Sequence, residues 1–388
     1  MYALGLLLPA ASLQTLVIGG GPNAFNNQIA IESNVRYMGR LVRPGDPFRV
    51  LFADGSLATK SVRFIADTPG PETKIGPFSV PGSKDQYREP QLPRLDGATI
   101  VDNVRNEIAA LAKTPKLPVL LYFTGHGSLA TDLKLSQFDL WSGGRFAVPD
   151  LVESLKPFNK NQPITILMVQ CHSADFANVL YKEGDKGRGL AENRTCGFFA
   201  STAARVAAGC TPAVNEEDYK DFTSYFVAAL TGQDRMGHSV TGVDFDRNGK
   251  VGMNEAFCWS LVHDDAIDTP ICTSDELLRN AAQIPDSEVF KTPYRDAVKW
   301  ANPAQRAALI GLSDRLKLDG EARLSDAYTK YANLDPKNMN MDPILGYRFV
   351  NLARSIVLSH ALGSNPDKAL KRRYATLVRD EASNPLRP

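Results

Sequence analysis

The stretch LPVLLYFTGHGS, residues 117–128, carries the strongest fold signal in the sequence. Its first seven residues form an almost continuous apolar run, which is typical of a strand buried on both faces. A second run of this kind lies in ITILMVQCHS, residues 164–173. His126 follows the first run and Cys171 follows the second. Strands buried on both faces occur in parallel sheets that helices cover, so the two runs predict an α/β protein.

Outward from these runs, apolar strands continue to alternate with helical patterns. Further strands are predicted at 14–20, 48–53 and 196–202, and helices at 28–43, 101–113 and 216–230. The residues FDLW, SGG and RFAV at 138–148 predict a small inserted hairpin, and a helix begins after it at Pro149 and Asp150. No element is assigned to the Gly-, Pro- and Lys-rich stretch that ends near residue 93. The prediction is a mostly parallel sheet with helices on both faces.

Strand signals stop near residue 285, and helical patterns dominate the rest of the chain. These patterns cover 303–317, 320–333, 345–361 and 366–380. They predict a separate helical region at 286–388, after a main domain at 14–285. Residues 1–13 resemble the apolar core of a signal peptide without its positively charged start, so a leading loop and an export signal are both open readings.

Composition and charge exclude several classes of protein. The 388 residues include 44 Lys and Arg against 43 Asp and Glu, and hydrophobic residues make up 43%. This balance is ordinary for a globular chain, and it argues against a polybasic nucleic-acid binder and an acidic disordered segment. No apolar run reaches the roughly 18 residues that a membrane-spanning helix needs, so we predict no such helix. The sequence makes no prediction of the oligomeric state.

Cys171 and His126 have the residue types and the placement of a nucleophile and its base. Ligand clefts form at the carboxyl ends of parallel strands, where both residues are expected. A thiolate attacks a carbonyl carbon while an imidazole takes and returns the proton. Gly127 permits close approach of the backbone, and its N–H and that of Cys171 are candidate oxyanion donors. Each signal alone is common in structural residues, whereas the two together, each after an apolar strand, favour catalysis.

Several blocks resemble the caspase and legumain superfamily of cysteine peptidases, most closely its bacterial legumain-like members. The blocks are VIGGGPNAFNNQ at 17–28, LLYFTGHGS at 120–128, FDLW at 138–141, ITILMVQCHSADFA at 164–177, FFASTAA at 198–204 and FTSYFVAALTG at 222–232. The resemblance implies a caspase-like three-layer sandwich. It also implies a cysteine endopeptidase in which Cys171 and His126 form a dyad that hydrolyses peptide bonds in a protein or peptide substrate, without an organic cofactor.

The sequence departs from the family pattern at two places near the expected cleft. The family places an arginine after the first strand to receive an acidic or amide side chain, and this chain has Asn26, Asn27 and Gln28 instead. Without that cation, cleavage after aspartate is not expected. The family follows its cysteine with an acidic residue and Ser-Gly, whereas this chain has HSAD at 172–175. The shape of the cleft beyond the scissile bond is therefore expected to differ.

The segment DFDRNGKVGMNE, residues 244–255, matches the twelve-residue calcium-loop pattern. The candidate ligands are Asp244, Asp246, Asn248, Lys250 through its carbonyl, and Glu255. Gly249 stands where this loop makes its sharp turn, and Gly252 stands where a water-mediated contact is usual. The preceding segment is not a clear helix, so we predict a structural Ca²⁺ site made of one loop and one helix. The alternative is an Asx turn with solvated carboxylates.

Candidate substrate-binding residues are Asn26, Asn27, Gln28, His172 and Ser201. A zinc site made of His172, His126 and Cys171 is an alternative, although the spacing and the fourth ligand of ordinary zinc sites are missing. A second alternative concerns the whole chain, which would be a calcium-stabilised binding scaffold that keeps the fold and has no catalytic activity.

The remaining cysteines are Cys196, Cys210, Cys258 and Cys272. Five thiols cannot all pair within one chain, so at least one stays free. The other four form up to two disulfides in an exported protein, with three pairings open, or stay reduced in a cytoplasmic one. The sequence slightly favours export. By analogy with the legumain prodomain, residues from about 290 are expected to restrain or shield the cleft, and the polar loop 182–194 is a candidate for autoprocessing.

Overall fold

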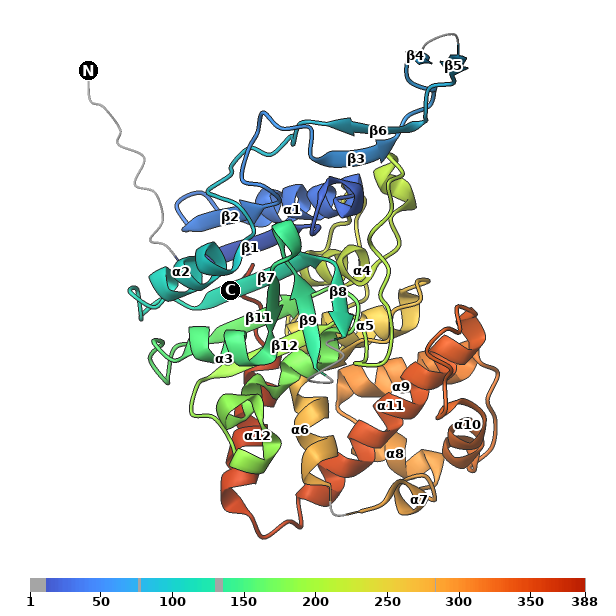
Figure 1. Cartoon of the computed structure of the whole chain (residues 1–388). Coiled ribbons are helices and arrows are strands. Elements are labelled where there is room, and N and C mark those ends of the chain that lie inside the picture. Colours follow the sequence, from blue (N-terminus) through green and yellow to red (C-terminus); the bar gives the residue numbers. More distant parts are fainter. Residues whose placement is uncertain (1–11, 76–77, 130–134, 283, 388) are drawn as a thin grey trace, which may run out of the picture.

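The computed structural model describes residues 12–75, 78–129, 135–282 and 284–387 (Figure 1). The expected leader therefore falls almost entirely outside the described residues. Among the helices that are described, none is long and apolar enough to cross a membrane.

A six-stranded sheet forms the centre of the molecule. Its strands are β1 (Gln14–Gly20), β2 (Phe48–Phe52), β7 (Val119–Gly125), β11 (Ile164–Met168), β12 (Thr195–Phe199) and β13 (Ile271–Cys272). Their order across the sheet is β13-β12-β11-β7-β1-β2. Strands β2 to β12 in this order run parallel, and the two-residue edge strand β13 runs antiparallel to β12. The predicted mostly parallel α/β sheet is confirmed.

Helices cover both faces of the sheet and complete three layers. The helices α1 (Ile29–Leu41), α4 (Phe222–Thr231) and α5 (Met253–His263) pack on one face, and α2 (Val101–Leu111) and α3 (Val148–Leu155) pack on the other. Successive strand residues alternate between these faces, so that Tyr122 enters the first core and Phe123 the second. This double burial explains why the strands are almost continuous apolar runs.

The inserted hairpin and the stretch before residue 93 contain more strands than the sequence indicates. β8 (Gly127–Leu129), β9 (Ser136–Asp139) and β10 (Arg145–Ala147) form a small antiparallel sheet, of which only the β9–β10 hairpin is predicted. β3 (Val62–Ile65) pairs with β6 (Asp85–Arg88), and β4 (Thr73–Ile75) pairs with β5 (Phe78–Val80). Figure 1 shows β4 and β5 at the end of an arm that projects from the body. Leaving this stretch without elements was wrong, because each strand is too short for its alternation to stand out.

The C-terminal part is helical, as predicted. Its helices are α7 (Asp286–Val289), α8 (Tyr294–Trp300), α9 (Pro303–Arg315), α10 (Arg323–Tyr331), α11 (Met341–Leu362) and α12 (Lys368–Glu381), and α6 (Thr273–Ala281) precedes them. α9 packs against α5, α11 against α6, and α12 against β12. Leu312 and Phe349 belong to the same hydrophobic core as the sheet residue Tyr122. The expected boundary near residue 285 is therefore not a break in the core.

Candidate active site

The ends of β7 and β11 bring the two candidate catalytic residues to one edge of the sheet. The strands are adjacent and parallel, with Phe123 opposite Met168. His126 follows β7 directly, and Cys171 follows β11 after two residues. A Cβ atom built on Gly127 would lie 2.2 Å from the carbonyl oxygen of Cys171, so the backbone segments after the two strands are in direct contact. Only glycine at 127 permits this approach.

The thiol of Cys171 lies against the backbone of Ala207. The N–H of Ala207 donates to Sγ at 3.2 Å, and the thiol donates to the carbonyl of Ala207 at 3.7 Å. Burial raises the pKa of Cys171, the hydrogen bond from Ala207 lowers it in part, and the carboxyls of Asp268 and Asp139 raise it further. The group is therefore held as a thiol, and a nearby base must take its proton before it attacks.

The imidazole of His126 is oriented by Gln28. Nε2 of His126 lies 2.9 Å from Oε1 of Gln28. Because that oxygen only accepts hydrogen bonds, Nε2 carries a proton in this contact. Burial lowers the pKa of His126, while the charge of Asp139 and a hydrogen bond to the backbone of Asn26 raise it. The ring is thus held in the neutral form that a general base requires.

Two of the expected substrate-binding side chains hold the backbone instead. Asn27 is fully buried, accepts the N–H of Gly21 at 3.2 Å and donates to the carbonyl of Ser61 at 2.9 Å. Ser201 is also fully buried, and its hydroxyl donates to the carbonyl of Gln170 at 3.5 Å. Both side chains are thus buried and hydrogen-bonded to the backbone. Short polar side chains after a strand often close turns in this way, which explains the difference from the expectation.

The other expected positions lie closer to the dyad. Gln28 contacts His126 rather than open solvent, and only 7% of its surface is exposed. The backbone of Asn26 borders His126, while its side chain is half-buried. Nδ1 of His172 lies 2.8 Å from the carbonyl of Ala203, so this nitrogen donates a hydrogen and does not offer a lone pair to a metal. Within the described residues, the three side chains of the zinc alternative form no metal-binding group.

Three residues of the site escape the sequence analysis. Ala207 contacts the thiol through its backbone alone, so its side chain gives no signal. Asp139 acts on the pKa of both His126 and Cys171, and it accepts the hydroxyl of Ser128 at 2.6 Å. It lies in the FDLW block, which predicts a hairpin and resembles the superfamily but does not mark Asp139 as a site residue. Arg205 has a buried guanidinium in the loop that contains Ala207.

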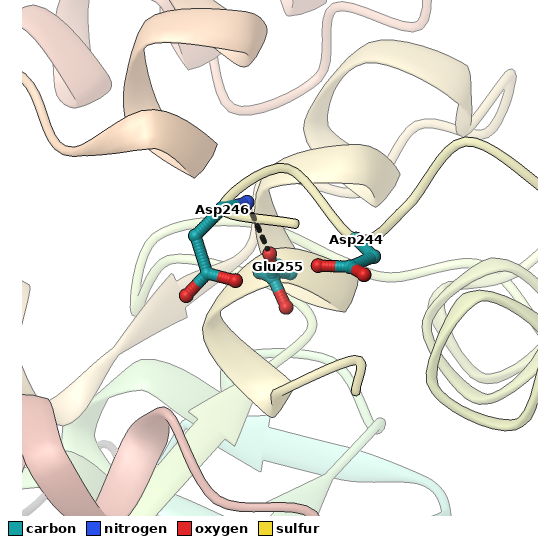
Figure 2. Close-up of side chains that lie close together, drawn as sticks. All are labelled: Asp244, Asp246 and Glu255. Carbon is teal, nitrogen blue, oxygen red and sulfur yellow. Dashed lines mark hydrogen bonds between the residues drawn. The ribbon is translucent and has the colours of Figure 1, made fainter. Parts of the chain in front are cut away.

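The predicted calcium loop brings three carboxylates together (Figure 2). One oxygen from each of Asp244, Asp246 and Glu255 lies within 4.8 Å of the others. Glu255 is buried, and its carboxylate accepts the N–H groups of Phe245 at 2.7 Å and Gly252 at 2.9 Å. Within the described residues, none of the three carboxylates pairs with a Lys or Arg inside 4.0 Å. Their mutual repulsion is thus uncompensated by a side chain.

The backbone of the loop wraps around its first carboxylate. Asp244 accepts the N–H of Asn248 at 3.0 Å and that of Gly249 at 2.9 Å. Gly249 has φ +85°, a conformation that favours glycine. Oδ1 of Asn248 accepts the N–H of Lys250 at 2.8 Å. The residues present therefore fit an oxygen-rich cation site, with α5 beginning inside the loop at Met253.

All five cysteines are free thiols in this structure. Cys196, Cys258 and Cys272 are buried, and Cys210 lies 3.5 Å from the carbonyl of Gly125, beside the candidate site. The pairings that the sequence leaves open are not formed here.

Comparisons with known proteins give matches among solved structures, two of them as follows. No protein-family model and no curated protein matches the chain. A solved structure of a protein from Geobacter sulfurreducens matches with a TM-score of 0.36 and 12% identity, over 67% of this chain and 92% of that one. A secreted C11 cysteine protease from Bacteroides thetaiotaomicron, solved with an irreversible peptide inhibitor, matches with a TM-score of 0.29 and 16% identity, over 57% of this chain and 54% of that one. This chain thus spans about half the length of that protease, and neither match assigns a family.

Proposed function

We propose that this protein is a cysteine endopeptidase that uses Cys171 as nucleophile and His126 as general base. The observation that carries the proposal is that His126 and Cys171 follow the carboxyl ends of adjacent parallel strands, where Gln28 orients the ring of His126 and Gly127 contacts the backbone of Cys171. The sequence blocks that contain these residues, LLYFTGHGS at 120–128 and ITILMVQCHSADFA at 164–177, resemble the caspase and legumain superfamily, and within it the bacterial legumain-like members. The missing arginine at 26–28 argues against cleavage after aspartate.

The proposed reaction proceeds through a thioester. Nδ1 of His126 takes the proton of Cys171 as Sγ attacks the carbonyl carbon of the scissile bond. The N–H groups of Gly127 and Cys171 stabilise the oxyanion. His126 then gives the proton to the leaving nitrogen, and the C–N bond breaks. A water attacks the thioester while His126 takes its proton, and the acid product leaves as Sγ regains a proton.

Replacing Cys171 with Ala tests this proposal. We expect the variant to lose all measurable cleavage of a fluorogenic peptide library scanned at P1, because it lacks the thiol that is proposed to form the thioester. Cys258→Ala is the control, because it removes a buried thiol of α5. This variant should cleave peptides at the wild-type rate, although it should be less stable. Unchanged turnover in the Cys171 variant would refute the dyad.

A second candidate function is a non-catalytic binding scaffold, and the contact of the Ala207 backbone with the thiol of Cys171 favours it. Ala207 contacts Sγ on both its N–H and its carbonyl, and burial raises the pKa of Cys171. In a scaffold, Cys171 would resist peptides with an alkylating group whatever P1 residue they carried. Labelling of Cys171 that depends on the P1 residue would exclude the scaffold.

We also propose that the loop 244–255 binds a structural Ca²⁺. The ligands would be Asp244, Asp246, Asn248, the carbonyl of Lys250, and Glu255. The support is the close group of carboxylates without a neighbouring Lys or Arg. Bound Ca²⁺ would offset their repulsion and hold the entry to α5, and we assign it no part in the chemistry.

Self-cleavage in the loop 182–194 belongs to the same proposal. Most of this loop is exposed, and it contains two short 3₁₀ turns, Lys182–Gly184 and Lys186–Arg188. Exposed polar loops are readily cut by peptidases. Intact mass over time should show a cut in this loop in the wild type and not in Cys171→Ala. A cut that also forms in the pure variant would assign it to another protease.

A further inference from the structure

Arg205 is a cation buried beside the proposed nucleophile. Only 2% of its surface is exposed. Its guanidinium donates to the carbonyl oxygens of Asp335 and Asn338, both at 2.7 Å. These residues lie in the turn 332–340 between α10 and α11, far along the chain. Within the described residues, no carboxylate forms an ion pair with Arg205 inside 4.0 Å. A buried cation without a carboxylate in direct contact is costly, and the carbonyls of Asp335 and Asn338, together with the more distant charges of Asp335 and Asp268, compensate it.

The backbone of Arg205 holds the turn that follows Cys171. Its carbonyl accepts the N–H of His172 at 2.9 Å, and the carbonyl of Ala203 accepts the ring N–H of His172 at 2.8 Å. His172 has φ +59°, a left-handed conformation that side chains other than glycine rarely adopt. Two residues after Arg205, the N–H of Ala207 reaches Sγ of Cys171 at 3.2 Å. The turn 332–340 is thus joined to the thiol by the hydrogen bonds of Arg205, by the covalent chain from Arg205 to Ala207, and by the hydrogen bond from Ala207 to Sγ.

A second buried arginine fixes the other end of the same loop. Arg348 of α11 donates to the carbonyls of Asp264 at 2.6 Å and Asp268 at 2.8 Å. The carboxyl of Asp268 in turn accepts the N–H of Ala208 at 2.7 Å. Arg205 directly, and Ala208 through Asp268, therefore attach the loop 203–208 to residues beyond 330.

We propose that Arg205 is a positioning residue, through which the turn between α10 and α11 holds the loop 203–208 in place on Cys171. The inference rests on the proposed peptidase function. It makes the C-terminal helices a permanent support of the active site, and not a segment that must leave before the site can work.

Two substitutions at Arg205 and one matched control test the inference in the full-length protein. Arg205→Met removes both hydrogen bonds to the turn, and Arg205→Lys keeps the charge and one of them. Arg354→Met is the control, because Arg354 of α11 pairs with Asp286 at 2.8 Å, within the C-terminal helices and without a contact to the loop 203–208. The measurements are kcat and KM for peptide cleavage, and the alkylation rate of Cys171 by iodoacetamide, located by peptide mass.

For Arg205→Met we expect kcat to fall by about 10- to 100-fold while KM changes by less than about twofold, because the thiol loses its orientation and the substrate contacts stay. Alkylation of Cys171 should become faster, by about fivefold, because the loop no longer covers Sγ. For Arg205→Lys, kcat and the alkylation rate of Cys171 should lie between those of Arg205→Met and those of the wild type. Arg354→Met should match the wild type in both measurements.

Three results would overturn the inference. A higher kcat in Arg205→Met would show that the helices shield the site. Equal changes in Arg354→Met would show a general loss of stability, and unchanged alkylation in both Arg205 variants would show that the loop does not depend on the turn. If the wild type cleaves no peptide, the proposed function fails, and the alkylation rates alone decide this inference. If Arg205→Met does not fold, Arg205→Lys decides it by the same measurements.

Discussion

At the scale of single residues, the hydrogen bond between Gln28 and His126 determines which ring nitrogen takes a proton. Gln28 accepts from Nε2 at 2.9 Å, so Nδ1 is the nitrogen that we propose as the base. Burial lowers the pKa of His126 below its ordinary value, so the ring is a neutral base at neutral pH. The acid limb of the rate profile should therefore fall as the pH drops through this lowered pKa, because protonated imidazole cannot take the proton of Cys171.

Replacing Gln28 with Glu should move that limb to higher pH by about one pH unit, because a carboxylate beside Nε2 stabilises the imidazolium form. Replacing it with Leu should lower kcat about tenfold across the profile, since neither tautomer is then favoured. The pH dependence of kcat/KM measures both effects. Gln233→Glu is the control, because Gln233 is exposed and follows the C-terminal end of α4. If the acid limb of the rate profile does not move in Gln28→Glu, Gln28 has no effect on the pKa of the catalytic base.

The sequence predicts part of this site and misses the rest for physical reasons. His126, Gly127 and Cys171 are found because apolar strands precede them and the carboxyl ends of parallel strands meet. Ala207 acts through its backbone, and Arg205 depends on a turn 130 residues away. Side-chain types near a motif carry no information on such contacts.

At the scale of elements, the loop 244–255 leads into α5 and also contacts the C-terminal tail. Met253 donates its N–H to the carbonyl of Ser383 at 3.0 Å, and the side chain of Asn384 donates to the carbonyl of Val251 at 2.8 Å. A ligand that orders this loop should therefore stabilise the tail as well as the start of α5.

Added Ca²⁺ should raise the melting temperature by at least about 3 °C at saturation, because it binds the folded loop and not the unfolded chain. Asp244→Asn should remove most of this rise, since it removes one of the three clustered carboxylates. Asp234→Asn, outside the loop, should keep it. Hydrogen exchange at 382–386 should slow with Ca²⁺ in the wild type. If Ca²⁺ does not change the melting temperature, the loop is better interpreted as an Asx turn with solvated carboxylates.

The short strands show where sequence patterns stop being informative. β1, β7, β11 and β12 are buried on both faces and stand out as apolar runs. β3 has a single fully buried residue, Val62, and β13 has only two residues. Such strands form because they pair with a neighbouring strand at the edge of a sheet or in a two-stranded ribbon, and that neighbour can be distant in the sequence.

At the scale of the whole molecule, the C-terminal helices and the sheet share one hydrophobic core. Leu312 of α9 is fully buried in that core, and α9 packs on α5. α12 returns to the sheet, where Asp380 pairs with Arg194 of the loop before β12. Helical periodicity predicts the helices, but it cannot show which surface they cover, so the sequence alone favours a separate region.

Leu312→Ala should therefore destabilise the whole protein by about 2–5 kcal/mol. Two variants, each with a single tryptophan, report on the two parts, because Trp141 lies beside the hairpin and Trp300 ends α8. Both reporters should unfold together and shift equally. Ile310→Ala, at an exposed site on the same helix, should change little. If Leu312→Ala shifts only the unfolding transition that Trp300 reports, the C-terminal helices are an independent domain.

The most direct test of the central claim is the mass of the protein after acid quench during cleavage of a P1-scanned peptide set. We predict a transient adduct of the acyl fragment that maps to Cys171 in the wild type, is absent in Cys171→Ala, and accumulates with the favoured P1 residue. Peptide cleavage that persists in Cys171→Ala, with no adduct at Cys171 in the wild type, would contradict the account.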